Sequence, residues 1–169
     1  RTFFQELIEV IKRLRKECPW DREQTNYSIS PQTIEEVYEV VEAVENADFP
    51  ELKNELGDLL LHVLFHTEIA SEAGHFSLDD VIKAITDKLI RRHPHIFGNT
   101  EAADSNAVKK NWEAIKLEEG RESVLQGVPK QLPGIQRAYR LQEKAAKVGF
   151  DWADKSDVWK KVLEEIDEM

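Results

Sequence analysis

The stretch TIEEVYEVVEAVENADFPELKNELGDLL, residues 33–60, decides the fold, because it reads as two helices joined by a short turn. On the first helix, apolar residues recur at helical spacing and predict an apolar seam of Ile34, Val37, Val41 and Val44. Asp48 is expected to cap the second helix, which runs to a stop at Gly74. A connection this short favours antiparallel packing of the two helices.

The same stretch carries an unusual set of carboxylates. Spacings of three and four residues place Glu35, Glu36 and Glu39 close together on the first helix, and Glu55 and Asp58 on one face of the second. Carboxylates that converge without a cation are costly to bury, and Mg²⁺ prefers carboxylate oxygens as ligands. The pattern therefore predicts a metal site between the helices. A solvated acidic face is the alternative, and it is the stronger one for the first helix taken alone.

Helical periodicity continues on both sides of this pair. The first helix of the pair is expected to begin with an N-cap at Ser30. Further helices are expected over about 2–17, from a cap at Ser77 to Arg92, from Ser105 to about Glu119, and over about 134–148 and 156–169. No stretch shows the period-two alternation of a strand. The sequence therefore predicts an all-α chain, folded as a helical bundle.

Composition narrows the possible partners and compartments. The chain of 169 residues has a formal net charge of -10, which argues against duplex nucleic acid and anionic membranes as partners. The longest apolar run, LLLHVLF at 59–65, is too short to cross a bilayer. Cys18 is the single cysteine, so no internal disulfide can form; this fits a reducing compartment, and a cytoplasmic location is expected.

Other metal chemistries fit the sequence less well. A di-iron bundle needs Glu-x-x-His on two helices, and this chain has one such spacing, Glu72 to His75. His62 and His66 are spaced i, i+4, which leaves a zinc pair open beside a role in packing. His93 and His95 flank Pro94 (residues 93–95), and either end a helix or contact a substrate.

Two pairs of residues with i, i+4 spacing could hold phosphate, and they are Lys88 with Arg92 and Trp112 with Lys116. Lys and Arg near a helix C-terminus also complement the helix dipole, and Trp112 could be a core residue. The alternative is a phosphate clamp, in which Arg binds oxygens bidentately and Lys acts as a point charge.

A weak internal repeat suggests a domain organisation. IEEVYEV at 34–40 is echoed by LEEIDEM at 163–169, so that the three glutamates of the first copy correspond to Glu164, Glu165 and Glu168. We expect a first domain at 1–120, a linker at 121–133, and the start of a second, truncated domain at 134–169. The chain is thus expected to be the front part of a tandem protein.

Several motifs, taken in order, resemble the MazG family of nucleoside triphosphate pyrophosphohydrolases, which belongs to the all-α NTP pyrophosphatases. They are CPWDREQT (18–25), TIEEVYEV (33–40), ELGDLLL (55–61), DKLIRRHPHIF (87–97) and NWEAIKLEE (111–119). The resemblance spans about residues 3–120. It implies a helical bundle forming a tight homodimer or a higher even oligomer. It also implies hydrolysis of NTP or dNTP to NMP or dNMP and pyrophosphate by Mg²⁺-activated water, with Mn²⁺ as an alternative metal.

The resemblance also assigns roles to residues. It implies metal ligation by Glu36, Glu39, Glu55 and Asp58, with Glu35 on a second metal or positioning water; catalytic roles for Glu35, Glu39 and Lys116; and substrate contacts from Lys88, Arg92, Trp112, Lys116 and Trp20. Which phosphorus is attacked and which base is preferred do not follow from the sequence. The alternatives are a non-catalytic metal- or nucleotide-binding dimerisation domain, with activity in a second domain, and a house-cleaning specificity for dUTP or damaged nucleotides.

Overall fold

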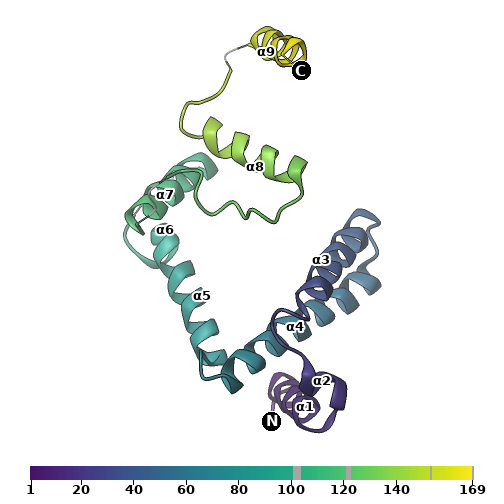
Figure 1. The fold of residues 1–169 in the computed structure, drawn as a ribbon. Coiled ribbons are helices and arrows are strands. Elements are labelled where there is room, and N and C mark those ends of the chain that lie inside the picture. Colours follow the sequence, from purple (N-terminus) through teal and green to yellow (C-terminus); the bar gives the residue numbers. More distant parts are fainter. Residues whose placement is uncertain (101–103, 121–122, 153, 169) are drawn as a thin grey trace. The chain divides into compact units, whose positions relative to one another are not determined.

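The computed structural model describes residues 1–100, 104–120, 123–152 and 154–168, and all regular elements within these ranges are helices (Figure 1). The predicted all-α class is therefore confirmed. The chain divides into two compact units, Arg1–Leu89 and Ile90–Met169. The domain limits expected from the repeat stay a prediction, and residues 101–103, 121–122, 153 and 169 of those segments lie outside the described ranges.

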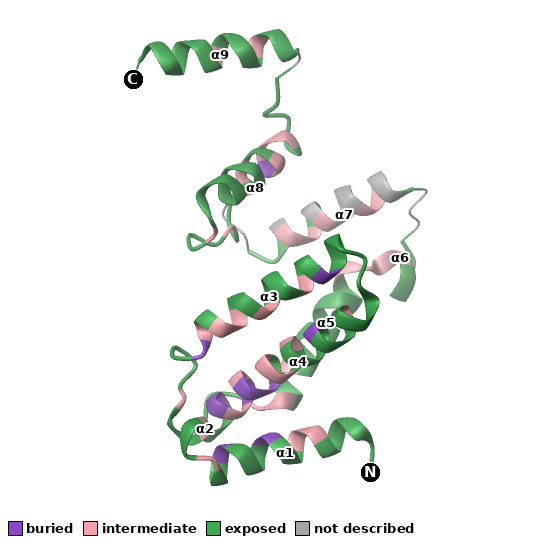
Figure 2. Cartoon of the chain, turned by 90° about the vertical axis from the view of Figure 1, so that its right-hand side faces the viewer, coloured by how far each residue is buried: buried purple, intermediate pink, exposed green. Residues whose placement is uncertain are grey.

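The first unit contains α1 (Phe3–Glu17), α2 (Pro19–Glu23), α3 (Ser30–Glu45), α4 (Phe49–Glu72) and most of α5 (Leu78–Arg92). The long helix α4 organises this unit, because α3 packs along one part of it and α1 along another (Figure 2). The core consists of Ile11, Ile29, Leu64, Phe65 and Ile69, with Leu7, Ile8, Leu61 and Leu78 packed around it.

Local sequence signals explain most of the helix ends. The Asp48 side chain accepts a hydrogen bond from the backbone N–H of Glu51 at 3.1 Å, which confirms the predicted cap of α4. That helix ends at Glu72, just before Gly74, which adopts a φ of +72° that glycine tolerates best. Ser30 was predicted to be the N-cap of α3, but it is the first residue of this helix. Its hydroxyl donates to the carbonyl of Tyr27.

Arg15 joins three elements of the first unit in a way the sequence pattern did not indicate. Its side chain is 7 % exposed and donates to both carboxylate oxygens of Glu72, at 3.1 and 2.5 Å. It also donates to the carbonyls of Asp21 and Gln24, and its guanidinium lies 5.5 Å from the ring centroid of Phe65. Glu72, the acidic residue of the single Glu-x-x-His spacing, therefore serves as the partner of Arg15 in this structure.

The face of α3 that packs on α4 is not the predicted apolar seam. The least exposed residues of α3 form the neighbouring stripe of Thr33, Glu36, Val40 and Ala43. The predicted seam stays exposed in the single chain, with Ile34 58 %, Val37 45 %, Val41 44 % and Val44 57 % accessible. The stripe toward α4 thus combines the polar Thr33 and Glu36 with the apolar Val40 and Ala43, and the predicted apolar seam faces another surface.

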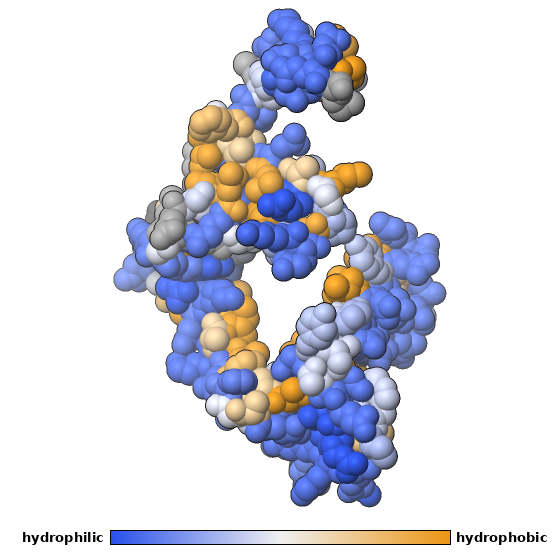
Figure 3. All heavy atoms as spheres, viewed as in Figure 1, coloured by the Kyte–Doolittle hydropathy of each residue, from blue (hydrophilic) through white to orange (hydrophobic). Residues whose placement is uncertain are grey.

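The second unit contains the end of α5, together with α6 (Pro94–Phe97), α7 (Ser105–Glu118), α8 (Gly134–Ala146) and α9 (Lys155–Asp167). The short helices α2 and α6 were not predicted, because one turn is too short to show periodicity. Apolar side chains gather along α8 on the face seen in Figure 3. In this helix Ile135 and Tyr139 are strongly exposed. None of the described helices combines the length and the hydropathy that a membrane span requires.

Candidate metal and nucleotide site

Three of the predicted metal ligands meet between α3 and α4. Glu36, Glu39 and Glu55 each offer a carboxylate oxygen, and these atoms all lie within 4.8 Å of one another. The helices are antiparallel here, since Thr33 faces His66, Glu36 faces His62 and Glu39 faces Glu55. The predicted spacing thus produces a convergent cluster, and no second cluster of this kind occurs among the described residues.

Glu55 is the member of the cluster that burial affects most. It is 8 % exposed, although it is charged at neutral pH in its ordinary state. Burial, reinforced by a hydrogen bond and charge repulsion from Glu39 and then from Glu51, raises the pKa of Glu55 to about 7. Such a carboxylate favours any cation that replaces its proton.

Asp58 and Glu35 lie at the margin of this cluster. Neither belongs to the set of three, but both raise the pKa of Glu36 through charge repulsion. The main cause of that rise is burial, followed by Glu39, whereas His62 acts in the opposite direction. The predicted five-carboxylate site is therefore arranged as a tight group of three with two carboxylates beside it. Metal ligation by each of the five stays a prediction.

Two hollows flank the cluster. One, of about 450 Å³, is mostly acidic and is lined by Glu39, Glu42, Ala43, Asn46, Asp48, Glu51 and Glu55. The other, of about 190 Å³, is mostly apolar and is lined by Leu14, Trp20, Asp21, Ile29, Gln32, Glu36, Leu61, His62 and Phe65. Trp20 and Glu36 therefore share one pocket, which places the predicted nucleoside contact next to the carboxylates.

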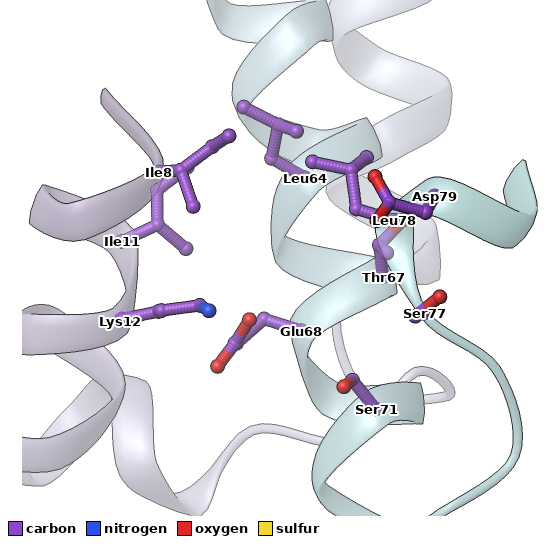
Figure 4. A pocket seen from close by; sticks show the side chains of 10 residues that line it. All are labelled: Ile8, Ile11, Lys12, Leu64, Thr67, Glu68, Ser71, Ser77, Leu78 and Asp79. Carbon is purple, nitrogen blue, oxygen red and sulfur yellow. The ribbon is translucent and has the colours of Figure 1, made fainter. Parts of the chain in front are cut away.

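A further hollow of about 270 Å³ lies between α1, α4 and the start of α5, away from the carboxylate cluster (Figure 4). Lys12 from α1 and Glu68 from α4 point toward one another across it, and Thr67, Ser71 and Ser77 line its other side. It shares no residue with the cluster or with the pocket of Trp20.

His62 and His66, the two candidate zinc ligands, both lie within hydrogen-bond distance of the Thr33 hydroxyl. The Thr33 hydroxyl lies 2.9 Å from His62 Nδ1 and 2.9 Å from His66 Nε2. Asn26 Nδ2 lies 2.9 Å from His66 Nδ1, and His62 Nε2 lies 3.7 Å from Glu36 Oε1. The sequence singled out the histidines through their spacing but missed Thr33 and Asn26, for which it offers no signal.

The predicted phosphate-binding residues are divided between the two units. Lys88 lies in the first unit, inside α5, and its side chain forms no hydrogen bond or ion pair with the described residues. Arg92 lies in the second unit and donates to Glu119 at 3.2 and 2.5 Å, as Arg91 also does at 2.8 Å. Together these arginines lower the pKa of Glu119 to about 2.

Trp112 and Lys116 are brought together, as their spacing predicts. Lys116 Nζ lies 5.5 Å from the Trp112 ring centroid, and the His93 ring meets the same indole edge-on at 5.1 Å. The indole Nε1 of Trp112 and Nδ1 of His95 are buried without a hydrogen-bond partner among the described residues. Whether Trp112 is a substrate contact or a core residue stays a prediction.

The echo of the acidic motif near the C-terminus is arranged differently. In α9, Glu164 and Glu165 both pair with Lys161, at 2.8 and 3.0 Å. Neither residue, nor Glu168, joins a cluster of potential ligands within the described ranges. The two copies of the motif therefore differ in their local electrostatics.

Comparisons with known proteins identify the family of this chain. Residues 24–97, which contain all five predicted carboxylates, match the family model described as the MazG nucleotide pyrophosphohydrolase domain. The chain is similar to the nucleoside triphosphate pyrophosphohydrolase of Escherichia coli K12, with 46 % identity over 96 % of this chain and 65 % of the relative. It is also 42 % identical to the nucleoside triphosphate pyrophosphohydrolase/pyrophosphatase MazG of Thermotoga maritima, over 98 % of this chain and 66 % of that one.

A solved structure shares the fold. The crystal structure of a mazG-related protein from Thermotoga maritima superposes with a TM-score of 0.60 and 26 % identity, covering 67 % of this chain and 98 % of the other. The present chain spans about two thirds of the length of the curated relatives from E. coli and T. maritima. With the carboxylates of α3 and α4 inside the matched segment, the chain belongs to the MazG family and carries a MazG nucleotide pyrophosphohydrolase domain at residues 24–97.

Proposed function

We propose that this chain hydrolyses nucleoside triphosphates to nucleoside monophosphates and pyrophosphate, using Mg²⁺ or Mn²⁺. The observation that carries the proposal is the convergence of Glu36, Glu39 and Glu55 from two helices, with Glu55 buried. The names of the relatives from E. coli and T. maritima support the reaction. An acidic chain needs a cation at this place before it can hold a triphosphate.

The donor set fits a hard divalent cation. Carboxylate oxygens are the ligands that Mg²⁺ and Mn²⁺ prefer, and an ion would offset the repulsion that raises the pKa of Glu55. Glu36, Glu39 and Glu55 would hold the ion, and Asp58 would complete the set from α4. A bound ion would supply Lewis-acid polarisation of the phosphate oxygens.

The chain's own residues would bind and orient the substrate around this position. The apolar pocket beside Trp20 suits a nucleobase, because an aromatic face stacks on a base without selecting it. The acidic hollow beyond Glu39 would then receive the phosphates together with their cations. Glu35 would orient the attacking water, and Lys88, from the same unit, would offset charge on the phosphates. Arg92, Trp112 and Lys116 belong to the second unit, and their contacts with substrate are what the MazG resemblance implies.

A homodimer would cover the apolar stripe that the single chain leaves exposed. Ile34, Val37, Val41 and Val44 form a continuous face on α3 at helical spacing. A contiguous apolar face of this kind marks an interaction surface. A second copy of this chain would bury it and place two carboxylate clusters in one assembly.

The test is product analysis with a panel of NTPs and dNTPs, including dUTP and oxidised nucleotides, in Mg²⁺, in Mn²⁺ and in EDTA. We expect equal amounts of nucleoside monophosphate and pyrophosphate, lost in EDTA. Release of inorganic phosphate and nucleoside diphosphate would contradict the proposed bond cleavage. No turnover by a chain that still binds Mn²⁺ would support a non-catalytic domain instead.

A further inference from the structure

A line of polar side chains runs from the surface of the first unit to the carboxylate cluster, and it serves no purpose in the proposed function so far. It contains Asn26, His66, Thr33 and His62, and it ends at Glu36. His62 and Glu36 are both largely shielded, with side chains 14 % and 20 % exposed. Polar groups shielded in this way are retained only where their hydrogen bonds are satisfied.

The proton positions along this line can be worked out from its first member. Asn26 Nδ2 lies 2.9 Å from the backbone carbonyl of His66, which can only accept, so the atom facing it is the amide nitrogen. The same nitrogen lies 2.9 Å from His66 Nδ1. Nδ1 of His66 is therefore an acceptor, and its proton is on Nε2. Burial lowers the pKa of His66, which favours this neutral form.

The next step passes through Thr33. His66 Nε2–H donates to the Thr33 hydroxyl, so the hydroxyl proton is available either to His62 Nδ1 at 2.9 Å or to the carbonyl of Ile29 at 3.1 Å. In the first case His62 carries its proton on Nε2, which faces Glu36. In the second case His62 Nδ1 donates to Thr33, and a neutral ring would present a lone pair to the carboxylate. The lone pair and the carboxylate would repel one another. Beside an ionised Glu36, His62 Nε2 is therefore protonated in both cases, with Nδ1 protonated as well in the second.

We propose that His62, fixed in orientation and tautomer by Thr33 and His66, is a positioning residue that directs an Nε2–H at Glu36 and aims this carboxylate at the metal position. The inference rests on the proposed function, because it needs Glu36 to be a ligand. The separation of 3.7 Å between His62 Nε2 and Glu36 Oε1 is longer than a hydrogen bond. These two atoms come within hydrogen-bond distance when a bound cation fixes Glu36 in its ionised form, as polar contacts at active sites often tighten on binding.

The first experiment measures Mn²⁺ affinity by electron paramagnetic resonance, without substrate. Thr33→Val and His62→Phe are expected to weaken Mn²⁺ binding about tenfold, the usual lower range for outer-shell partners of metal ligands. Thr33→Ser, which keeps the hydroxyl, and His62→Gln, which keeps an N–H near the Nε2 position, are expected to restore most of the affinity. A loss that neither conservative variant restores would overturn the inference.

Thr67→Val is the matched control. The Thr67 hydroxyl donates to the carbonyl of Val63, four residues earlier, as the Thr33 hydroxyl lies within reach of the carbonyl of Ile29, and Thr67 is 6 % exposed. Although Thr67 follows His66 in the chain, its hydroxyl bonds to Val63 and not to the line of polar residues. We expect unchanged Mn²⁺ affinity in this variant. Equal losses in Thr33→Val and Thr67→Val would show a general effect of hydroxyl removal and overturn the inference.

The second experiment needs no variant that could fail to fold. Nitrogen-15 spectra of the histidine rings in the metal-free protein report which ring nitrogen carries the proton. We expect Nε2–H for His66 and a protonated Nε2 for His62; a His62 ring protonated on Nδ1 alone would overturn the inference. Absence of Mn²⁺ binding by the parent chain would overturn the proposed function and the inference with it. Intact parent binding with unchanged affinity in Thr33→Val would overturn the inference alone.

Discussion

Glu39 on α3 and Glu55 on α4 face one another across the helix pair, with carboxylate oxygens within 4.8 Å, and Glu55 is buried there. This relationship brings together residues sixteen positions apart in sequence, through a turn capped by Asp48. It joins two acidic motifs in one site, where the carboxylates repel one another and one of them is buried. This repulsion and the contacts around the site determine how changes of pH and sequence should act.

The stability of the metal-free protein is expected to fall as the pH rises through 7. The pKa of Glu55 is raised from its ordinary value of 4.5 to about 7, so the folded state binds this proton more tightly than the unfolded state. The stabilisation is complete below pH 4.5 and is lost as the pH rises through 7. Thermal melts in EDTA between pH 5 and 8 measure it.

Glu55→Gln should flatten this dependence, whereas Glu45→Gln, an exposed change on the same pair of helices, should keep it. Mg²⁺ should raise the melting temperature of the parent chain more at pH 8 than at pH 5, because the ion competes with the proton. A Glu55→Gln variant whose pH dependence matches that of the parent would contradict the assignment.

Arg15→Met is expected to destabilise the first unit by roughly 2–3 kcal/mol, because charged hydrogen bonds to Glu72 and to two backbone carbonyls are lost together. Arg13→Met is the control, since Arg13 pairs with Glu17 at the surface and such pairs contribute little. Urea unfolding followed by circular dichroism gives both values. Equal midpoints for the two variants would show that Arg15 does not join α1 to α4 as described.

Glu119→Gln is expected to strengthen binding of a non-hydrolysable nucleoside triphosphate analogue by up to about fivefold, the range of an exposed ion pair. The change removes a carboxylate to which Arg91 and Arg92 both donate, so one competitor of the substrate phosphates is lost. Calorimetry measures the affinity, with the exposed neighbour Glu118→Gln as control. Weaker binding would indicate that Glu119 orients the arginines instead of competing for them.

Val37→Asp is expected to convert a dimer into a monomer, because it places a charge in the centre of the exposed α3 stripe. Light scattering should give about twice 19.6 kDa for the parent chain and 19.6 kDa for the variant. Val10→Asp, at an equally exposed apolar position on α1, should leave the mass unchanged. A monomeric parent would contradict the proposed assembly.

Helical periodicity was sufficient to predict the long helices, because their caps and apolar spacing are local properties. Asp48 and Gly74 mark the ends of α4 as expected. The one-turn helices α2 and α6 have no period to detect. The stripe predicted on α3 is apolar. Apolar spacing alone does not show which stripe of α3 packs on α4.

The site was predictable where spacing alone defines it. The motifs place Glu36, Glu39 and Glu55 on two adjacent helices, and the short turn brings them together. The roles of Arg15 and Thr33 depend on contacts with residues far away in sequence, at Glu72 and His62, so no local pattern could show them. The ion pair of Arg92 with Glu119 is of the same kind.

The most direct test of the central claim is Mg²⁺-dependent pyrophosphate release from a nucleoside triphosphate by the parent chain and by Glu39→Gln, Glu55→Gln and Glu45→Gln. If the cluster between α3 and α4 is the catalytic metal site, the first two variants lose about a hundredfold or more of turnover with their helical spectra intact, and Glu45→Gln keeps it. Near-parent turnover in Glu39→Gln and Glu55→Gln would contradict the claim.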